Sequence, residues 1–584
     1  MSRYREAMVS VVDRRAKWAR FFFLILASVS VTRLAYLQIM EHPKYEALAN
    51  GQHELYKKIF PKRGEVFFHD TEGTLIPAAM NKTKYRLYTV PREMTNTSKV
   101  GVTHAQDAAE ALSLILGVPS EILLAQLTKP NDPYEPLQNG LEEADADAVR
   151  ALNIAGVYLT PELSRYYPLG AIGAHLTGFV GQGDQGPHGQ YGVEGYFEKL
   201  LAGEIGVITA ERDASGRRIS VGGAGTELGT DGGDIIVTVD VPLQYFTCKA
   251  LAEGIARFGA ESGVVVIMNP QNGRVVALCN NPSYDPNGYS SVADIRYFNN
   301  AAIFTAYEPG SVFKPITMAA GLDAHVVTPE TTYENTGSVA IGIHTIHNVD
   351  QKTHGLATMV DVLDKSLNTG AVFVAEKTGK ETFSKYVKDF GFGELTGIEL
   401  DTEVEGNITS LDRQGEIYMA TASFGQGITV TPMQLIRAYA AIANGGKILK
   451  PHIVDELRHP DGKIETTEPE VVRQVIAERT STLLSGMLVS VVSKGHAKNA
   501  QIPGYYIAGK TGTAQIADAQ AGGYGEGTIH TFIGFGPVAY PRFVILVKLD
   551  RPQNVLFADA SATIVFAEIA RYLVDYWQIP PDAV

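Results

Sequence analysis

The residues GVVVIMNPQNGRVVALCNN, 263–281, contain two apolar runs separated by a Pro-Gln-Asn-Gly turn signal. Valine-rich runs of this length, joined by a segment that contains Asn-Gly, predict a β-hairpin. Three more strand candidates follow much later in the chain and begin at Tyr505, Thr528 and Arg542. The segment Ser561 to Trp577 places apolar residues along one helical face, so it is expected to cover the sheet. This order predicts an α/β (α+β) domain whose antiparallel sheet of about five strands is interrupted by a mainly helical insert.

The composition is that of a globular protein long enough for two or more domains. The chain has 584 residues, of which 45% are hydrophobic and 20% charged, and its formal net charge is −14. Residues 1–20 hold six Lys or Arg residues against two acidic ones, which leaves 44 basic and 62 acidic residues in the rest. An acidic body of this kind argues against nucleic-acid binding.

The basic tail leads into an apolar segment, Phe21 to Met40, which is 20 residues long and contains one charge, Arg33. A helix of that length spans about 30 Å, the thickness of a bilayer core. Positive residues before the segment predict a cytoplasmic tail over 1–20, a transmembrane anchor over 21–40 and an extracytoplasmic body. A cleaved signal peptide and a buried helix are the alternatives, but no clear A-x-A site follows the segment.

A Gly-rich stretch, Val221 to Asp234, is typical of a linker and divides the exterior into residues 41–225 and 226–584. The first part mixes a strand signal, Lys84 to Val90, with an amphipathic helical run, Ala105 to Leu116. It is expected to form a domain of its own without a catalytic cluster.

Cysteine and histidine usage gives no sign of metal chemistry. The two cysteines, Cys248 and Cys279, lie in apolar stretches and are expected to be small buried residues, with a disulfide as the less favoured alternative. The fourteen histidines are scattered without metal-ligand spacing. No metal and no cofactor are predicted.

The decapeptide YEPGSVFKPI, 307–316, places a Ser-x-x-Lys pair after a Pro-Gly turn. Apolar residues of helical spacing follow, so a helix should begin near Ser311, with Pro315 in its first turn. Residues i and i+3 share a helix face, so a neutral Lys314 could take the proton of a nucleophilic Ser311. The alternative is an N-cap serine beside a solvated lysine.

Two further short motifs follow in chain order. SLNTG, 366–370, holds the only Ser-x-Asn, although on local grounds alone an exposed turn is the better explanation. KTG occurs twice. The copy at 377–379 follows a helical run and is expected to end a helix at Gly379, whereas the copy at 510–512 lies in an alternating strand, where an extended substrate could dock and Gly512 would admit it closely.

The ordered triple of Ser-x-x-Lys, Ser-x-Asn and Lys-Thr-Gly resembles the penicillin-binding proteins and serine β-lactamases. The flanking segments YEPGSVFK, SFGQGITVTPMQ and GKTGTAQ look like penicillin-binding transpeptidases. Farther upstream, KRGEVFFHD, ELSRYYP and GQYGVEGYFEKLLAGEIG resemble the α+β pedestal of class B enzymes. Two departures are Leu367, where small or polar residues are more usual, and the spacing around Arg63.

The resemblance implies a membrane-anchored D,D-transpeptidase that cross-links peptidoglycan stem peptides and is acylated by β-lactams. Ser311 would be the nucleophile, Lys314 its base, Ser366 a proton relay and Asn368 a hydrogen-bonding partner of the substrate backbone. Lys510 would supply positive charge and favour a neutral Lys314. Thr511 and Thr513 would hold the terminal carboxylate beside Gly512, and the backbone N–H groups of Ser311 and Thr513 would form the oxyanion hole.

Two other functions stay open for such a chain. A carboxypeptidase or β-lactamase would resolve the acyl group with water, and a scaffold or β-lactam sensor would use the fold without turnover. The resemblance also implies a place in the bacterial inner membrane, in division or elongation, and a polytopic glycosyltransferase as partner.

Overall fold

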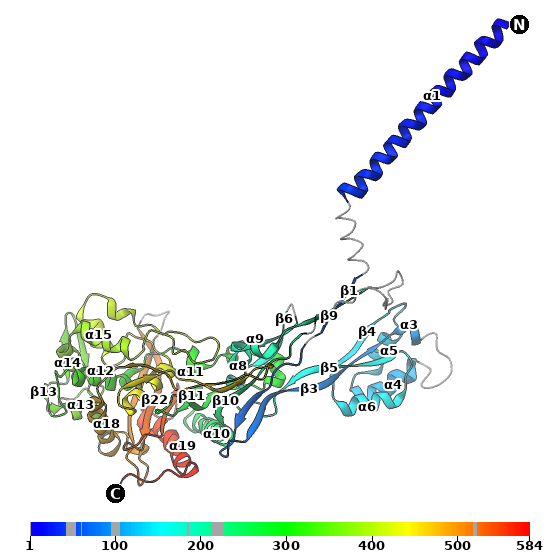
Figure 1. The fold of residues 1–584 in the computed structure, drawn as a ribbon. Coiled ribbons are helices and arrows are strands. Elements are labelled where there is room, and N and C mark those ends of the chain that lie inside the picture. The colour runs from blue at the N-terminus through cyan, green and yellow to red at the C-terminus, as the bar shows by residue number, and fades with distance from the viewer. Residues whose placement is uncertain are drawn as a thin grey trace. The chain divides into compact units, whose positions relative to one another are not determined.

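The computed structural model describes residues 2–41, 54–59, 61–94, 105–183, 186–211, 226–227, 229–517 and 523–583 (Figure 1). They form two compact units, one built from residues 1–61 and 204–230 and the other from 62–203 and 231–584. The predicted domain boundary at residue 225 and part of the Gly-rich stretch, residues 221–225 and 228, lie outside the described residues. That boundary therefore stays a prediction.

The smaller unit contains the predicted membrane segment. Helix α1 (Ser2–Ala35) continues into a π-helical turn, η1 (Tyr36–Met40). Within the described residues, Arg20–Met40 is the one helical stretch long and apolar enough to cross a membrane, and none of it is buried. A small antiparallel sheet of β1 (Glu54–Ile59), β8 (Gly206–Glu211) and β9 (Thr226–Glu227) completes this unit.

The larger unit contains the predicted sheet, with the strand order β12-β11-β23-β22-β21. All neighbouring pairs in it are antiparallel. The strands expected from the sequence are all present: β11 (Ser262–Met268), β12 (Val275–Asn281), β21 (Ala508–Ala517), β22 (Tyr524–Gly536) and β23 (Phe543–Asp550). Strands β11, β12 and β23 are buried almost throughout because helices cover the sheet, which explains their continuous apolar sequence.

Helices α10 (Val241–Phe258) and α19 (Ala562–Tyr576) pack together against this sheet, and the rings of Phe246 and Tyr572 stack at 3.9 Å between them. Helix α19 confirms the helix expected over 561–577. Helix α17 (Pro432–Ala443), every residue of which is buried, also contacts β11, β22 and β23.

A mainly helical insert separates β12 from β21, as expected. It includes α11 (Ala301–Phe304), α12 (Lys314–Asp323), α13 (Met359–Asp364), α14 (Asn368–Thr378), α15 (Lys380–Asp389), α16 (Glu416–Ala422), α17 and α18 (Glu478–Ser493). Short strands pair between them: β13 (Thr332–Asn335) with β16 (Gly355–Thr358), β14 (Ser338–Ile341) with β15 (His344–His347), and β17 (Lys447–Leu449) with β20 (Val471–Gln474).

A second sheet joins the two parts of the sequence. Its path is β19-β18-β10-β2-β3-β4, with β5 paired to β3, and it is mixed because β10 and β2 run parallel. The strands are β2 (Val66–His69), β3 (Leu75–Thr89), β4 (Glu135–Leu141), β5 (Val157–Tyr166), β10 (Asp234–Asp240), β18 (Val454–Arg458) and β19 (Ile464–Thr466). Helices α4 (Ala105–Leu116), α5 (Ser120–Leu127) and α6 (Glu143–Leu152) form a small separate core with β3 and β4. Strand β3 and helix α4 confirm the two local expectations for this region.

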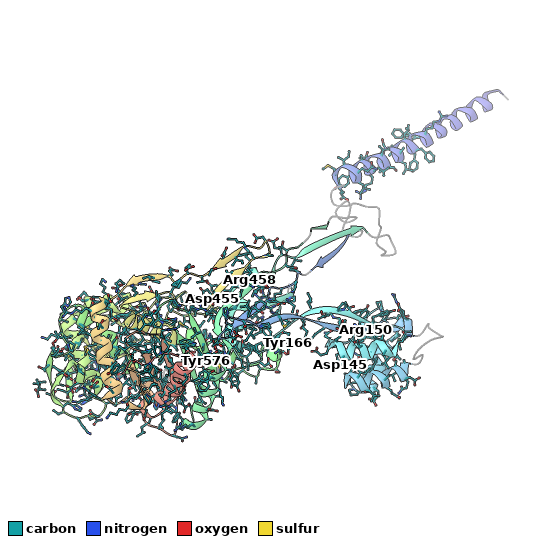
Figure 2. The ribbon with its side chains drawn as sticks, turned by 60° about the horizontal axis from the view of Figure 1, so that its bottom comes forward. Asp145, Arg150, Tyr166, Asp455, Arg458 and Tyr576 are labelled. Carbon is teal, nitrogen blue, oxygen red and sulfur yellow. A yellow bond between two sulfur atoms is a disulfide. The ribbon has the colours of Figure 1, made fainter. Side chains whose placement is uncertain are left out.

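Side-chain contacts hold this mixed sheet together and tie it to neighbouring elements, and Figure 2 labels two of the residues that make them, Asp455 and Tyr576. Asp455 on β18 accepts from Arg274 at 2.5 Å and lies 3.2 Å from the ring nitrogen of His69 on β2. The hydroxyl of Tyr576, at the end of α19, donates to Asp240 at 3.0 Å. Asp240 also caps α10, so one carboxylate fixes the junction of β10, α10 and α19.

The three upstream segments that resemble class B pedestals meet in a buried ionic cluster. Arg63 donates to Glu194 at 2.7 Å and to Glu198 at 2.6 Å, and Arg165 donates to Glu194 at 2.6 Å. Glu194 is fully buried, so each charge needs its opposite to offset the loss of water. The guanidinium of Arg63 thus reaches the cluster although the spacing around this residue departs from that of the family.

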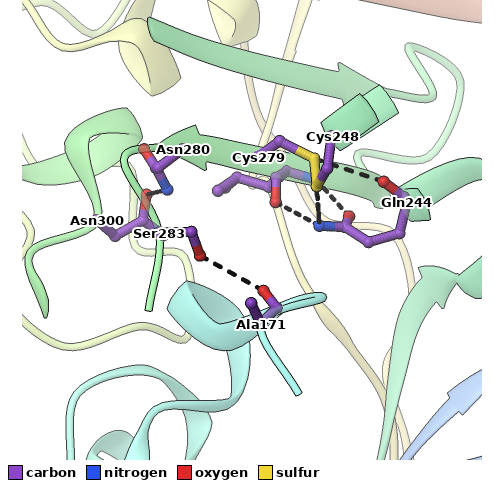
Figure 3. Close-up of a disulfide and its surroundings, with 8 residues drawn as sticks. Ala171, Gln244, Cys248, Cys279, Asn280, Ser283 and Asn300 are labelled. Carbon is purple, nitrogen blue, oxygen red and sulfur yellow. Dashed lines mark hydrogen bonds between the residues drawn. A yellow bond between two sulfur atoms is a disulfide. The ribbon is translucent and has the colours of Figure 1, made fainter. Parts of the chain in front are cut away.

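The two cysteines form a disulfide, which corrects the expectation of two separate buried thiols (Figure 3). Cys248 lies on α10 and Cys279 on β12, and packing of that helix on that strand brings their Cα atoms to 5.2 Å. The amide of Gln244, one turn before Cys248, donates to the Leu278 carbonyl at 2.7 Å and accepts from the Leu278 N–H at 2.9 Å. The expectation was wrong because the proximity comes from tertiary packing and leaves no mark in the local sequence.

Candidate active site

Ser311 lies in a tight turn that leads into a helix, as the sequence predicts. A 3-10 turn, η4 (Gly310–Phe313), precedes α12, and Pro315 occupies its first turn. Gly310 has a φ of 59°, and its N–H donates to the Gly425 carbonyl at 3.0 Å. The buried Tyr439 hydroxyl on α17 donates to the Val312 carbonyl at 2.7 Å. The turn that carries the half-buried Ser311 is therefore held from two sides.

Lys314 is buried, with only 1% of its surface exposed, so the alternative of a solvated lysine is wrong. Its Nζ donates to the carbonyl oxygen of Ser366 at 2.6 Å and to the Ser366 Oγ at 3.1 Å. Burial lowers the pKa of Lys314 well below its ordinary value, and the nearby positive charge of Lys510 lowers it further. A buried amine of this kind can hold its neutral form and accept a proton.

Ser366 occupies the junction between α13 and α14 with a left-handed backbone, φ 55°. The next residue, Leu367, is 1% exposed and belongs to the main hydrophobic core. The apolar middle of this Ser-x-Asn motif therefore anchors the junction by burial. Asn368 begins α14, and its amide donates to the His347 carbonyl at 2.9 Å.

A buried polar network supports the start of α14. Asn335 donates to the Tyr333 hydroxyl at 2.6 Å and to the Thr369 hydroxyl at 2.9 Å, and the side-chain amide of Asn348 donates to the side-chain oxygen Oδ1 of Asn335 at 3.1 Å. The backbone N–H of Thr369 donates to Asn348 at 3.2 Å. Buried amides that find partners on each other fix the backbone beside Ser366 and Asn368.

Lys510 is fully buried on β21, the strand at the edge of the five-stranded sheet. Its Nζ donates to the Ser366 Oγ at 3.0 Å, so one hydroxyl lies between the two lysines. Burial lowers the pKa of Lys510 to about 7, although the carboxylate of Asp364 raises it. The structure thus brings together Lys314, Ser366 and Lys510, which lie far apart in the sequence.

The remaining predicted residues follow along β21. A methyl group on Gly512 would lie 3.0 Å from the Pro309 carbonyl oxygen and 3.0 Å from the Val312 side chain. The glycine is therefore required for the approach of the Ser311 turn, and its role in admitting a substrate stays a prediction. Thr513 accepts from the Ala558 N–H at 3.1 Å, while the hydroxyl of Thr511 contacts a histidine.

That histidine, His496, was missed from the sequence. It follows α18 and contacts the carbonyl of Asp364, the hydroxyl of Thr511 and the Nζ of Lys510. Glu308, beside the Ser311 turn, was missed as well, and it accepts from the Gly427 N–H at 2.9 Å and from the Tyr524 hydroxyl at 3.0 Å. Glu308 lies within the quoted stretch YEPGSVFKPI, but no residue at catalytic spacing pointed to it, and His496 lies outside every quoted motif. The contacts of both residues come only from the fold.

Comparison with known proteins places these motifs in a family. The model of the penicillin-binding protein transpeptidase domain matches residues 263–571, and that of the penicillin-binding protein dimerisation domain matches residues 58–237. Stage V sporulation protein D of Bacillus subtilis is 33% identical over 567 residues, which cover 96% of this chain and 85% of that protein. The probable peptidoglycan D,D-transpeptidase PbpC of Pseudomonas aeruginosa is 30% identical over 570 residues, 96% of this chain and 94% of that protein.

Among solved structures, penicillin-binding protein 2X of Streptococcus thermophilus superposes with a TM-score of 0.75 at 22% identity, covering 91% of this chain and 83% of that one. That likeness shows the fold, while the family models and the relatives carry the assignment. The chain belongs to the class B penicillin-binding proteins, a family of peptidoglycan D,D-transpeptidases.

Proposed function

We propose that this protein cross-links peptidoglycan stem peptides by acyl transfer through Ser311. The observation that carries the proposal is the pair of buried lysines, Lys314 and Lys510, whose Nζ atoms lie 3.1 and 3.0 Å from the one hydroxyl of Ser366. Two ammonium groups so close in a buried site repel each other, so one of them is neutral. Lys314, whose pKa burial lowers well below its usual value, is the base.

In the acylation step, the Ser311 hydroxyl attacks the carbonyl carbon of the D-Ala-D-Ala bond and its proton passes to the neutral Nζ of Lys314. The backbone N–H groups of Ser311 and Thr513 stabilise the oxyanion. The C–N bond then breaks, and a proton reaches the leaving D-Ala amine through the Ser366 hydroxyl. An amine from a neighbouring stem peptide attacks the resulting ester, forms the cross-link and returns the proton to Ser311.

The edge position of β21 supports the placement of the substrate. An edge strand presents backbone groups that can pair with an extended peptide. Asn368 hydrogen-bonds the peptide backbone from the opposite side, and the hydroxyls of Thr511 and Thr513, with the charge of Lys510, hold the terminal carboxylate. β-Lactams enter the same site and acylate the same serine.

Penicillin labelling tests the nucleophile. Ser311→Ala is expected to fold as wild type yet to take up no fluorescent penicillin, while the matched control Ser291→Ala, at an exposed serine, is expected to label fully. Peptide mapping of the labelled wild type should recover the peptide that contains Ser311. Label on another serine, or persistent label in folded Ser311→Ala, would contradict the proposal.

A product assay separates the transpeptidase from its alternatives. A D-Ala-D-Ala donor peptide mixed with an acceptor amine is expected to give the joined product with release of D-Ala, detected by mass spectrometry. Loss of D-Ala without joining would indicate a carboxypeptidase, and no turnover would indicate a scaffold. The intact triple of Ser-x-x-Lys, Ser-x-Asn and Lys-Thr-Gly favours an enzyme over a scaffold.

The same proposal includes a topology and a partner. The basic tail over residues 1–20 stays in the cytoplasm, Phe21 to Met40 anchors the chain, and the catalytic part works outside the inner membrane. A polytopic glycosyltransferase that makes the glycan strands is the expected partner. Protease added outside spheroplasts should digest the chain beyond about residue 40, and protection of that region would reverse the topology.

A further inference from the structure

His496 holds its imidazole in one tautomer. Its Nδ1 lies 2.6 Å from the carbonyl oxygen of Asp364, and a carbonyl oxygen can only accept, so Nδ1 carries the proton. In the neutral ring, Nε2 then offers a lone pair. That lone pair faces the hydroxyl of Thr511 and the Nζ of Lys510, which lies 3.2 Å away.

The ammonium group of Lys510 has three N–H donors and finds three acceptors. They are the Ser366 Oγ at 3.0 Å, the Thr511 carbonyl at 3.2 Å and the Nε2 of His496 at 3.2 Å. A fully buried ammonium needs each of these, because no water replaces a lost acceptor. Of the three, only His496 is a side chain outside the three motifs that mark the family.

We propose that His496 is a positioning residue for the acyl transfer, whose neutral imidazole accepts a hydrogen bond from Lys510, keeps that lysine protonated and aims it at Ser366 and at the carboxylate of a bound substrate. The inference rests on the proposed function, because it assigns His496 a role in the same site. It adds a specificity for anionic substrates that depends on a residue outside the motifs.

The charges around Lys510 agree with a neutral His496. The titratable groups that face Lys510 are Lys314 on α12, Asp364 on α13 and His496 after α18. The residue paired with Lys510 on the neighbouring strand β22 is Ile533, which carries no charge. Burial, together with the charge of Lys510, lowers the pKa of His496 to about 3. The ring therefore remains an acceptor throughout the pH range in which the enzyme is assayed.

Removal of that acceptor should lower the pKa of Lys510 further. Burial already holds this pKa at about 7, and the hydrogen bond to His496 favours the charged form. A hydrogen bond to a charged group corresponds to about one to two pH units. The alkaline limb of acylation, where Lys510 loses its proton, should therefore move to lower pH by that amount.

Two amides of different length test this prediction. The amide oxygen of His496→Gln reaches the place of Nε2 and can accept from Lys510, whereas the shorter His496→Asn reaches only the place of Nδ1. We expect His496→Asn and His496→Phe to shift the alkaline limb of β-lactam acylation down by about one to two pH units and therefore to slow acylation above the limb by about 10- to 100-fold. His496→Gln should keep the wild-type limb. His459→Phe, on the β18–β19 hairpin, is the matched control and should leave the profile unchanged.

The readout is the second-order rate of acylation of the full chain in detergent between about pH 5 and pH 10, since this rate reports ionisations of the free enzyme. A limb that stays in place in His496→Asn, with a rate lowered equally at every pH, would overturn the inference and leave the proposed function standing. If the alkaline limb moved as far in His496→Gln as in His496→Asn, that result would overturn the inference as well. A wild type that no β-lactam acylates would overturn the proposed function itself.

Discussion

The tripeptide Lys-Thr-Gly occurs twice in this chain, and the two copies differ in secondary structure, burial and side-chain contacts. Lys377 is exposed near the end of α14, with its Nζ 5.6 Å from the ring of Phe373, whereas Lys510 is fully buried on an edge strand. The Thr378 hydroxyl donates back to the Val374 carbonyl within its own helix at 2.8 Å, whereas the Thr511 hydroxyl contacts His496.

The glycines differ in the same way. Gly379 has a φ of 81° and ends α14, and an added methyl group would meet nothing within 4 Å. Gly512 lies in the regular strand β21, and an added methyl group would meet Pro309 and Val312 at 3.0 Å. One glycine is needed for its backbone conformation and the other for the close approach of the Ser311 turn. The structural surroundings of a Lys-Thr-Gly copy, rather than the tripeptide itself, therefore decide whether it can take part in catalysis.

The largest effect is expected where a buried lysine must be neutral. Lys314→Arg keeps the charge and similar reach, but an arginine with a pKa above about 12 cannot accept the proton of Ser311. We expect the rate of penicillin acylation to fall by a factor on the order of 10² to 10⁴, the usual contribution of a general base.

Lys377→Arg is the matched control at an exposed lysine and should acylate as wild type, with circular dichroism to verify the fold of both variants. Near-normal acylation by Lys314→Arg would make Lys314 an electrostatic anchor and would place the base elsewhere, with Ser366 and its neighbours as the next candidates.

The second effect compares the two copies directly. Lys510→Ala removes a buried charge that contacts Ser366, and a charged hydrogen bond lost in a buried site should slow acylation by about 10- to 100-fold. Lys377→Ala should leave acylation intact and change the free energy of unfolding by less than about 0.5 kcal/mol. Stopped-flow acylation and urea unfolding measure both quantities, and the reverse ranking would show that the active copy had been misassigned.

The sequence could distinguish these copies because their neighbours differ in period. AVFVAE before Lys377 has the character of a helix, and the apolar alternation around Lys510 is that of a strand. Strands β11, β12 and β23 gave a different signal, a continuous apolar run of strand length, whereas α19 showed a helical period along one face. The candidate site was predicted in another way, from the ordered motifs of a known family. Those motifs supply Ser311, Lys314, Ser366 and Lys510.

What the sequence could not supply depends on contacts between distant segments. Strand β2 pairs with β10 about 170 residues later, and neither strand carries a signal for its partner. The disulfide requires α10 to lie on β12, and His496 requires the end of α18 to lie beside β21. Each was missed for the same physical reason, since local periodicity records burial but not the identity of the neighbour.

The smallest effects are expected for substitutions at the two glycines. They compare Gly379, which is needed for its backbone conformation, with Gly512, which is needed for a close contact. Gly379→Ala forces a side chain into a backbone with φ 81° and ψ 150°, a conformation that favours glycine, so the cost should be about 1–3 kcal/mol of unfolding free energy with acylation unchanged. Gly512→Ala places its methyl group against Pro309 and Val312, where overpacking costs about 1–3 kcal/mol and displaces the turn that carries Ser311. Its acylation rate should therefore fall together with its stability. If Gly512→Ala lost stability but acylated at the wild-type rate, the approach of β21 to the Ser311 turn would matter for folding alone, and the position of Ser311 would be set by Tyr439 and Gly425 on the other side of the turn.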